Sequence, residues 1–501
     1  MSFGPPPSMY TQSAMAADDR RRKRRRNRLL ALAAAAVVAA AAVVGVAVLR
    51  DQGAPARAEK APPAAQDRLD VRETVEKRPA STTGVMDFRF SVDDMAPGEH
   101  EDLPGMWATD KILAKGIKST LVGLRIGTDA SPGDEVWRLR LTGLICGYTR
   151  HVTVDHRTAV LSRGRAEDPQ APCDHVTYVD LDDGRKIWDH EIPVSRIGGG
   201  QDTPSVTLTH ATVAVTWGGG AEAYDMDLGK KLWQTKAPAR CRDMGVAGGR
   251  ALLERLDCSN PSANATSWDS ALYKVRGIDP RTGRVLWTYS ATPGIRDLRV
   301  PSTEPPVLAV AAGDTGYTEL LSLDDHGSSR ATVRLKSGNY LGECSEDIDY
   351  LVLDDCPTIA VGSGQVFVRA KDEGGAHNSN WVIGFDLASG ASVKKFESGP
   401  NALLYPIRMS GDQLLALRLS EDHISPSALV SLDPRTGTET PYFYFGVASE
   451  AEKFTVLDAS DVVVQNGRLF FGSHSADGPS GKQGKEWTWL ALGIGGDAAK
   501  S

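Results

Sequence analysis

The chain of 501 residues is 41% hydrophobic and 24% charged, a balance typical of folded globular proteins and not of disordered ones. Its net charge of −7 is unevenly divided, because residues 1–50 carry nine basic and two acidic residues and leave 48 basic and 62 acidic residues for the rest. An acidic body excludes nucleic acid as its main partner, since phosphate binding requires a basic surface.

The N-terminal region predicts a membrane anchor. A basic tract at residues 20–26 ends a tail of 28 residues, and residues 29–49 that follow are uncharged and mostly Ala, Val and Leu. At ~1.5 Å per residue, this stretch spans ~31 Å as a helix, the thickness of a bilayer core. Basic residues before such a helix keep the N-terminus in the cytoplasm. We therefore expect a cytoplasmic tail (1–28), one transmembrane signal anchor (29–49) and a body outside the cell membrane.

Cleavage of this segment as a signal peptide is the alternative, with Ala56-Arg57-Ala58 as a weak processing site. The apolar stretch is, however, longer than the ~7–15 residues of a signal-peptide core. No cysteine lies near it to carry a lipid. A composition rich in Ala, Arg, Gly and Asp is typical of bacteria with GC-rich genomes, so the membrane is taken to be bacterial.

Residues 50–84 are polar and rich in Ala and Pro, which predicts a flexible or semi-extended linker. The folded body is expected over residues 85–496, followed by a short tail at residues 497–501.

All six cysteines lie in this body, at Cys146, Cys173, Cys241, Cys258, Cys344 and Cys356. An even number in an exported region predicts disulfides. Spacing does not fix the connectivity, but pairing of consecutive cysteines is the simplest arrangement, each pair closing a short loop between the turns of neighbouring repeats. No two cysteines have the two-to-four-residue separation of a zinc site, so no metal site is expected.

A hairpin motif recurs along the body. It consists of an apolar residue and Asp, then Gly four positions later and Trp four positions after that. Asp closes one strand and can accept hydrogen bonds from the turn, while Gly supplies a positive φ. The four sharp copies contain Asp129, Gly133 and Trp137; Asp180, Gly184 and Trp188; Asp225, Gly229 and Trp233; and Asp279, Gly283 and Trp287.

Three blurred copies follow, at Asp324, Asp386 and Asp433, and an eighth strand at residues 486–496 lacks the Asp. Successive Asp residues are 45 to 62 positions apart. This period is that of one four-stranded propeller blade. Further hairpins supply the other strands, as at residues 205–217, 358–370 and 461–473. The spacing predicts an all-β propeller of eight blades, or seven if the weakest repeat is not a full sheet.

The ends of the body predict how the ring closes. The last repeat stops after its third strand, whereas residues 84–94, before the first repeat, alternate in polarity like a strand. Donation of this N-terminal segment as the missing fourth strand would remove the open sheet edges. Each motif Trp is expected to pack against the adjacent blade.

The motif hairpins resemble the repeats of the PQQ-like (quinoprotein dehydrogenase-like) β-propeller family, and the resemblance covers roughly residues 85–496. That family includes dehydrogenases that use pyrroloquinoline quinone (PQQ) and calcium to oxidise alcohols or sugars. It also includes cofactor-free binding proteins such as the outer-membrane assembly lipoprotein of the barrel-assembly machinery.

The chain lacks the residues that are typical of the dehydrogenases in this family. The alcohol dehydrogenases of the family stack the quinone on a disulfide of adjacent cysteines, and no two cysteines are adjacent here. The sugar-oxidising relatives also lack that disulfide, but no calcium-ligand motif can be carried over to this chain either. The resemblance therefore implies a scaffold that binds a protein or envelope partner, with no catalytic residues and no cofactor. A PQQ-dependent alcohol or sugar dehydrogenase with an atypical site is the alternative.

Overall fold

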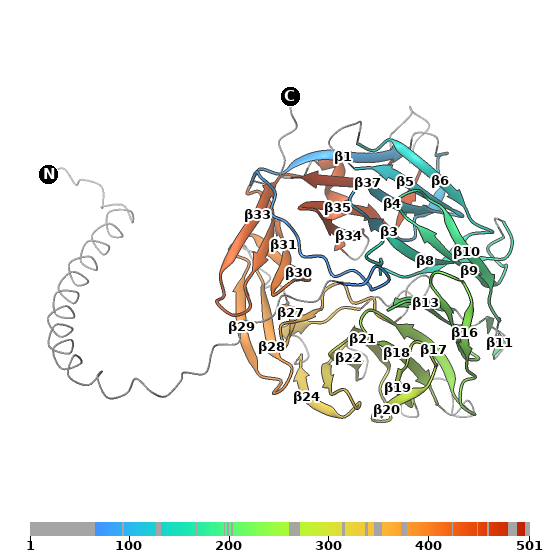
Figure 1. The fold of residues 1–501 in the computed structure, drawn as a ribbon. Coiled ribbons are helices and arrows are strands. Elements are labelled where there is room, and N and C mark those ends of the chain that lie inside the picture. The colour runs from blue at the N-terminus through green and yellow to red at the C-terminus, as the bar shows by residue number, and fades with distance from the viewer. Residues whose placement is uncertain are drawn as a thin grey trace, which may run out of the picture. The chain divides into compact units, whose positions relative to one another are not determined.

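Alternating strands and tight turns fold the body into an eight-bladed β-propeller, and almost all its ordered elements are strands (Figure 1). The computed structural model describes residues 66–92, 95–126, 132–166, 168–194, 196–197, 200–201, 204–259, 271–312, 316–335, 339–344, 353–371, 378–422, 424–447, 449–457, 460–478 and 488–495. Within these residues no helix has the length and apolarity needed to cross a bilayer. The anchor expected at residues 29–49 lies outside them, as does Asp129 of the first motif.

The first four blades follow one another along the chain, each running from its inner to its outer strand. Blade 1 contains β3 (Met106–Ala108), β4 (Ile112–Ile117), β5 (Thr120–Arg125) and β6 (Glu135–Arg140). Blade 2 contains β7 (Ile145–Tyr148), β8 (Arg157–Arg163), β9 (Cys173–Asp180) and β10 (Lys186–Glu191). Blade 3 contains β13 (Ser205–Thr209), β14 (Thr212–Thr216), β15 (Ala221–Asp225) and β16 (Lys231–Gln234). Blade 4 contains β17 (Arg242–Ala247), β18 (Leu252–Asp257), β19 (Tyr273–Ile278) and β20 (Val285–Ser290).

The other four blades complete the ring. Blade 5 contains β21 (Asp297–Thr303), β22 (Pro306–Ala311), β23 (Glu319–Leu323) and β24 (Ser329–Arg334). Blade 6 contains β25 (Tyr340–Leu341), β26 (Ala360–Gly362), β27 (Gln365–Ala370), β28 (Trp381–Asp386) and β29 (Ser392–Glu397). Blade 7 contains β30 (Ala402–Ser410), β31 (Gln413–Ser420), β32 (Ser427–Leu432) and β33 (Glu439–Phe445). Blade 8 contains β34 (Ser460–Gln465), β35 (Arg468–Ser473), β37 (Thr488–Gly495) and β1 (Val85–Val92).

Short elements lie outside the blades. They are the antiparallel pair β2 (His100–Asp102) and β36 (Ser475–Asp477), the pair β11 (Arg196–Ile197) and β12 (Gly200–Gln201), and the 3₁₀ helix η2 (Ser449–Thr455).

The N-terminal strand closes the ring, as the sequence predicts. β1 is the outermost strand of blade 8 and pairs antiparallel with β37, with Val85 opposite Gly495 and Val92 opposite Thr488. Its Phe88 is buried and meets Phe470 of β35 edge-to-face, with ring centroids 5.8 Å apart. Strands from the two ends of the body thus form one sheet.

The motif residues hold neighbouring blades together. Trp137, Trp188 and Trp233 each donate their indole N–H to a carbonyl in the hairpin of the next blade, at 3.1, 2.9 and 2.8 Å. Each ring also covers the turn glycine there, since a Cβ on Gly184 would lie 2.4 Å from Trp137. The expected packing of each Trp on the adjacent blade is confirmed. In the blurred copy at Asp386, the aliphatic stem of Lys394 covers Gly437 of the next blade instead.

The three disulfides join Cys146 to Cys173, Cys241 to Cys258, and Cys344 to Cys356. This is the predicted pairing of consecutive cysteines. The predicted placement is wrong, because each bridge lies within a single blade and does not join turns of neighbouring repeats. The hairpins of one blade already bring its strand ends together, so a bridge there needs no further folding of the chain.

Candidate functional site: the central channel

The axis of a propeller is where its eight inner strands face one another, and in this protein an insertion enters that space. The inner strand of blade 6 is divided into β25 and β26, which both pair with β27 but are separated by residues 342–359. Leu353 in this insertion is fully buried, and its carbonyl accepts a 2.8 Å hydrogen bond from the amide of Val300 in the inner strand of blade 5. We refer to residues 353–356 as the channel plug.

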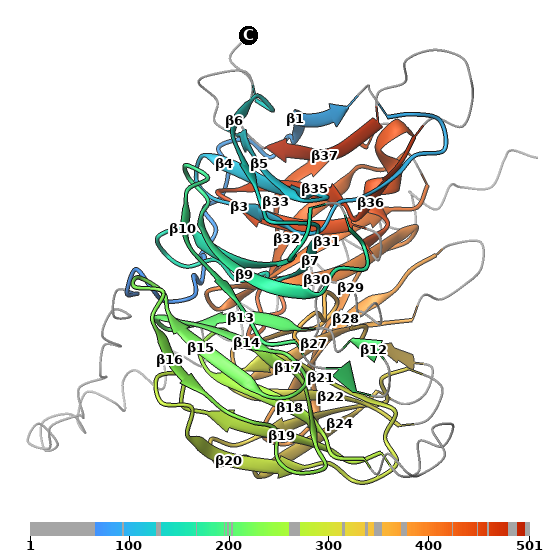
Figure 2. The ribbon, with the colours of Figure 1, turned by 90° about the vertical axis from the view of Figure 1, so that its right-hand side faces the viewer.

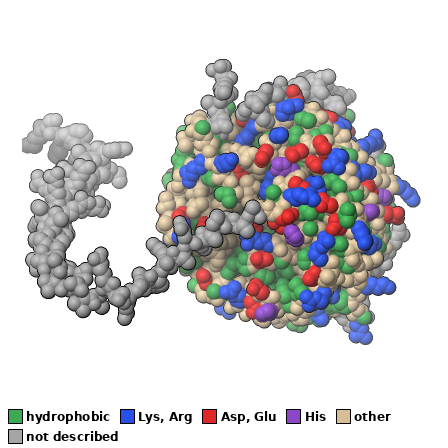
Figure 3. Space-filling model, viewed as in Figure 1, with side chains coloured by type: hydrophobic (Ala, Val, Ile, Leu, Met, Phe, Trp, Pro, Cys, Tyr) green, Lys and Arg blue, Asp and Glu red, His purple; other side chains and the backbone are tan. Residues whose placement is uncertain are grey.

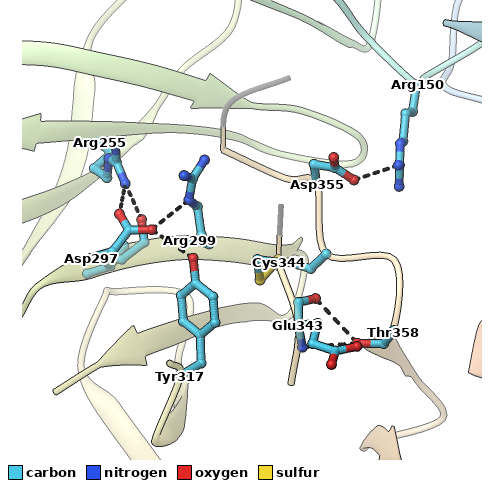
Figure 4. Close-up of a disulfide and its surroundings, with 11 residues drawn as sticks. Arg150, Arg255, Asp297, Arg299, Tyr317, Glu343, Cys344, Asp355 and Thr358 are labelled. Atoms are coloured by element: carbon cyan, nitrogen blue, oxygen red, sulfur yellow. Dashed lines mark hydrogen bonds and ion pairs between the residues drawn. A yellow bond between two sulfur atoms is a disulfide. The ribbon is translucent and has the colours of Figure 1, made fainter. Parts of the chain in front are cut away.

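The plug also reaches the far side of the channel. Asp355 is buried and forms a 2.6 Å ion pair with Arg150 (Figure 4). Asp354 lies 3.1 Å from the Nε2 atom of His151. Both partners directly follow the inner strand of blade 2. Contacts with blades 2 and 5 by a segment that starts in blade 6 place the plug across the channel. Burial raises the pKa of Asp355, and the guanidinium of Arg150 opposes that rise.

A disulfide and hydrogen bonds hold the base of the plug. Cys344 and Cys356 are both buried, and their bridge closes the insertion on itself. Beside it, the amide of Glu343 donates to the Thr358 hydroxyl at 3.0 Å, and Arg369 contacts the Glu343 carboxylate at 3.1 Å. Figure 4 shows this base next to the Asp355 contact. The insertion that carries the plug is therefore closed at its base, next to blade 6.

A second charge cluster joins blades 4 and 5. Asp297 accepts hydrogen bonds from Arg255 at 2.6 Å, from Arg299 at 2.8 Å and from the Tyr317 hydroxyl at 2.7 Å (Figure 4). Burial alone would raise the pKa of Asp297, but the two guanidinium groups and the hydroxyl outweigh it and hold that pKa well below its usual range. This carboxylate stays charged at neutral pH and holds both arginines.

A third cluster joins blades 1 and 8. Lys115 is fully buried, donates to the Leu103 carbonyl at 2.6 Å and lies 3.4 Å from Asp461, which also contacts His474 at 3.3 Å. Burial lowers the pKa of Lys115, and Asp461 opposes that change. Lys115, His474 and Arg150 overcome the effect of burial on Asp461 and hold its pKa low. The three clusters leave these buried charges paired within the chain.

One face of the ring is crossed by residues 66–84, which we call the strap (Figure 1). At this face the first strand of each blade turns into the second. The strap contacts these turns near Ala108, Val152, Ala211, Arg250, Ser410 and Gly467. They belong to blades 1, 2, 3, 4, 7 and 8, and blades 3 and 7 are opposite in an eight-membered ring. The strap therefore passes over the channel.

Ion pairs fix the strap along its length. Arg68 pairs with Asp155 and Asp227 at 3.1 and 2.5 Å, and Glu73 pairs with Arg250. Its last residues pair with the outer strand of blade 7, where the Tyr444 amide donates to the Thr82 carbonyl at 2.8 Å. Residues 66–84 therefore do not form a separate linker, as the prediction of a flexible or semi-extended linker over residues 50–84 had it, but are bound to the propeller. These residues have the composition of a linker because they do not bury an apolar pattern of their own. Hydrogen bonds and ion pairs with the propeller hold them in place.

The predicted repeat residues do not form a site. The described Asp, Gly and Trp residues of the motif lie in the outer hairpins, where they hold the blades together, away from the plug. Sequence reasoning did not find the channel clusters or the strap. One signal did point to the plug: the longest step in the repeat, 62 residues from Asp324 to Asp386, contains it.

Comparison with known proteins places this architecture in a family. No curated protein sequence matches the chain significantly. Among solved structures, BamB from Moraxella catarrhalis is 11% identical, with a TM-score of 0.39 over 79% of this chain and 99% of its own. The quinohemoprotein alcohol dehydrogenase ADHIIG from Pseudomonas putida HK5 is 12% identical, with a TM-score of 0.46 over 85% of this chain and 79% of its own.

The quinohemoprotein alcohol dehydrogenase from Comamonas testosteroni is 13% identical, with a TM-score of 0.44 over 86% of this chain and 82% of its own. The decisive match is that of a family model described as outer membrane protein assembly factor BamB, which fits residues 172–440 and 273–489 and so covers more than half of the chain. The chain belongs to this PQQ-like β-propeller family.

Proposed function

We propose that the protein is a non-catalytic binding scaffold: an extracytoplasmic propeller, held at a bacterial cell membrane by one N-terminal helix, that binds a protein or an envelope component. The observation that supports this most is that the chain itself bridges the channel. The plug contacts blades 2 and 5 from an insertion in blade 6, and the strap crosses one end of the channel. The surfaces that remain for a partner are the outer rim and the loops, which vary freely on a rigid ring.

The anchor is supported by sequence and by the cysteines. Residues 29–49 have the length and apolarity of a spanning helix, and the basic tract before them favours a cytoplasmic N-terminus. Three disulfides suit a body that is exposed to an oxidising compartment. The only connection between membrane and propeller would then be the segment that leads into the strap.

A protein or envelope partner agrees better with the surface charge than nucleic acid does. On the face drawn in Figure 3, acidic and basic side chains are interspersed, without a continuous basic area. Phosphate backbones require such an area. The family description also names an assembly factor and not an enzyme.

The channel residues do not fit a quinone cofactor. PQQ carries carboxylates, which would need cationic side chains without a counter-ion. Arg150, Arg255 and Arg299 are instead engaged by Asp355 and Asp297. Among the described residues, no three His, Cys, Asp or Glu side chains are grouped as ligands for a calcium ion. We therefore derive no reaction step for this channel.

Two measurements on the full-length protein test the proposal. The first is its melting temperature during titration with PQQ and calcium. A bound ligand at ~100 times its dissociation constant would stabilise the fold by ~2.7 kcal/mol. We expect no shift, and a saturable shift would support the dehydrogenase instead.

The second measurement is site-specific photocrosslinking in intact cells. The crosslinker is placed in turn at the rim and at exposed loop positions such as Ile424, which is 89% exposed. We expect one reproducible partner at a contiguous set of positions. The absence of any adduct at both the rim and the loops would contradict the scaffold function.

A further inference from the structure

The outermost strands of the eight blades differ in one respect. Seven of them contain at least one charged residue, as in Glu-Val-Trp-Arg-Leu-Arg of β6 and Ser-Val-Lys-Lys-Phe-Glu of β29. The exception is β20 of blade 4, whose sequence is Val-Leu-Trp-Thr-Tyr-Ser. Charges on an edge strand prevent it from pairing with another chain. β20 lacks this protection.

The edge of β20 is open to solvent. The strand pairs with β19 on one side and is the last strand of its sheet. It lies at the rim of the ring, at the bottom of Figure 2. Val285 is 40% exposed and Leu286 is 51% exposed. An uncharged, partly apolar edge of this kind is a template for a further strand.

The protein itself shows that blade edges accept extended segments. Beyond β33, the outer strand of blade 7, the strap adds two backbone hydrogen bonds: the Tyr444 amide donates to the Thr82 carbonyl at 2.8 Å, and the Gly84 amide donates to the Tyr444 carbonyl at 2.7 Å. In blade 8, the N-terminal strand β1 supplies the complete outer strand. The same geometry at β20 is not used by any described part of the chain.

We propose that the free edge of β20 binds an extended segment of a partner protein, which adds to blade 4 as a fifth strand. This inference rests on the scaffold function proposed above and names the kind of contact that the scaffold makes. Backbone hydrogen bonds would provide affinity, and alternate side chains of the segment would provide specificity.

Charge and space define the segment further. Exposed Arg284 precedes the strand, and Lys274 of β19 lies opposite Ser290 at its other end. A pocket between blades 3 and 4, lined by Val285, Trp233 and Thr235 among others, adjoins the start of the edge. The fitting segment therefore alternates apolar residues and carries a carboxylate near Arg284.

The size of the edge favours a peptide over a second copy of the protein. Six residues at ~3.4 Å per residue extend for ~20 Å. A stable interface between folded proteins buries ~800 Å² on each partner, more than one edge strand offers, whereas an added strand can bind through its backbone alone.

The test uses the full-length protein and a fluorescent heptapeptide of sequence Glu-Val-Thr-Val-Thr-Val-Thr, measured by fluorescence anisotropy. We expect saturable binding that Leu286→Lys weakens at least tenfold. The matched control is Val393→Lys in β29, since Val393 is also an exposed apolar residue (53%) on an outer strand. It should leave binding unchanged. The same peptide with alternate backbone nitrogens methylated should not bind.

Three results would overturn the proposal: no saturable binding at millimolar peptide, equal weakening by both lysine variants, or undiminished binding of the methylated peptide. A dimer in sedimentation equilibrium that Leu286→Lys dissociates would identify a second copy as the occupant and also overturn it. If a cellular partner crosslinks at the loops but not at position 286, the scaffold function stands and this inference fails.

Discussion

The Glu76 carboxylate, which is buried, accepts a 2.5 Å hydrogen bond from the guanidinium of Arg408, 332 residues later in the chain, and a 2.9 Å bond from the amide of Gly467. This pair fastens the strap to blades 7 and 8. Burial lowers the pKa of Arg408, and the charge of Glu76 opposes that effect. Loss of this ion pair would leave the buried Glu76 carboxylate without a cationic partner, which would lower the free energy of unfolding.

Replacement of this carboxylate should release the strap. In Glu76→Gln the partly buried Arg408, whose side chain is 32% exposed, loses its counter-ion. Removal of one partner of a fully buried pair costs ~3–5 kcal/mol, so we expect a loss somewhat below that range. Urea unfolding measures the loss, and hydrogen exchange should show reduced protection of residues 66–84. Glu73→Gln is the control, since its pair with Arg250 is exposed and such pairs contribute ~0–1 kcal/mol. Equal effects of both changes would show that Glu76 is not the anchor.

The tryptophan contacts between blades predict a cost for filling the turn glycine. Gly283 has a φ of 71°, and a Cβ there would lie 2.7 Å from Trp233. Gly283→Ala should therefore combine backbone strain of ~1–2 kcal/mol with overpacking of ~1–3 kcal/mol. The control is Gly98→Ala. Gly98 has a φ of 77°, but no atom lies near a Cβ at this position, so the substitution measures the backbone strain alone. If Gly283→Ala and Gly98→Ala lower the thermal stability equally, the close contact between Gly283 and Trp233 would be contradicted.

The Asp297 cluster predicts a pH-dependent stability. Because the folded-state pKa of Asp297 is lowered, its contribution is complete above the unfolded pKa of ~3.9 and is lost as the pH falls through the folded value. Asp297→Asn should cost ~3 kcal/mol at pH 7, since it leaves Arg255 and Arg299 without a counter-ion.

Urea unfolding at pH 7, 5 and 3 measures the free energy of unfolding of wild type and Asp297→Asn. The difference between the two free energies should narrow below about pH 4. Asp325→Asn, in an exposed turn, is the control and should show little change at any of these values. A difference that stays constant down to pH 3 would argue that the charge of Asp297 is not what holds the two arginines.

Closure of the ring by β1 predicts the effect of truncation. A chain that starts at residue 95 lacks β1, so it exposes the edge of β37 and loses the buried Phe88. We expect it to aggregate or to lose cooperative thermal unfolding, because an open edge and an incomplete core remain. A chain that starts at residue 85 lacks the strap and all residues before it but keeps β1, and it should still unfold cooperatively. If both chains aggregate, loss of the residues before β1 is enough to disrupt the ring. If both unfold cooperatively, β1 is not required for closure.

The sequence by itself predicted the repeat, the strand content and the closing strand, whereas for the cysteines it offered only the simplest of several possible pairings. The repeat and the strand content depend on local interactions, and the closing strand could be predicted because the last repeat lacks its fourth strand. Asp and Gly define each hairpin turn, and each motif Trp reaches only the next hairpin. Even the hairpin at Asn466 and Gly467, both with positive φ, follows from these two residues alone.

Only the tertiary structure determined which charged residues pair in the channel and which residues of the propeller hold the strap. Asp355 lies beside Arg150, and Glu76 lies beside Arg408, because closure of eight blades brings distant segments to one axis and one face. Neither pair has a sequence pattern, since an ion pair requires only opposite charges at short distance. A polar stretch such as residues 66–84 resembles a linker until the folded ring supplies its partners, and this is why its order could not be predicted from its composition.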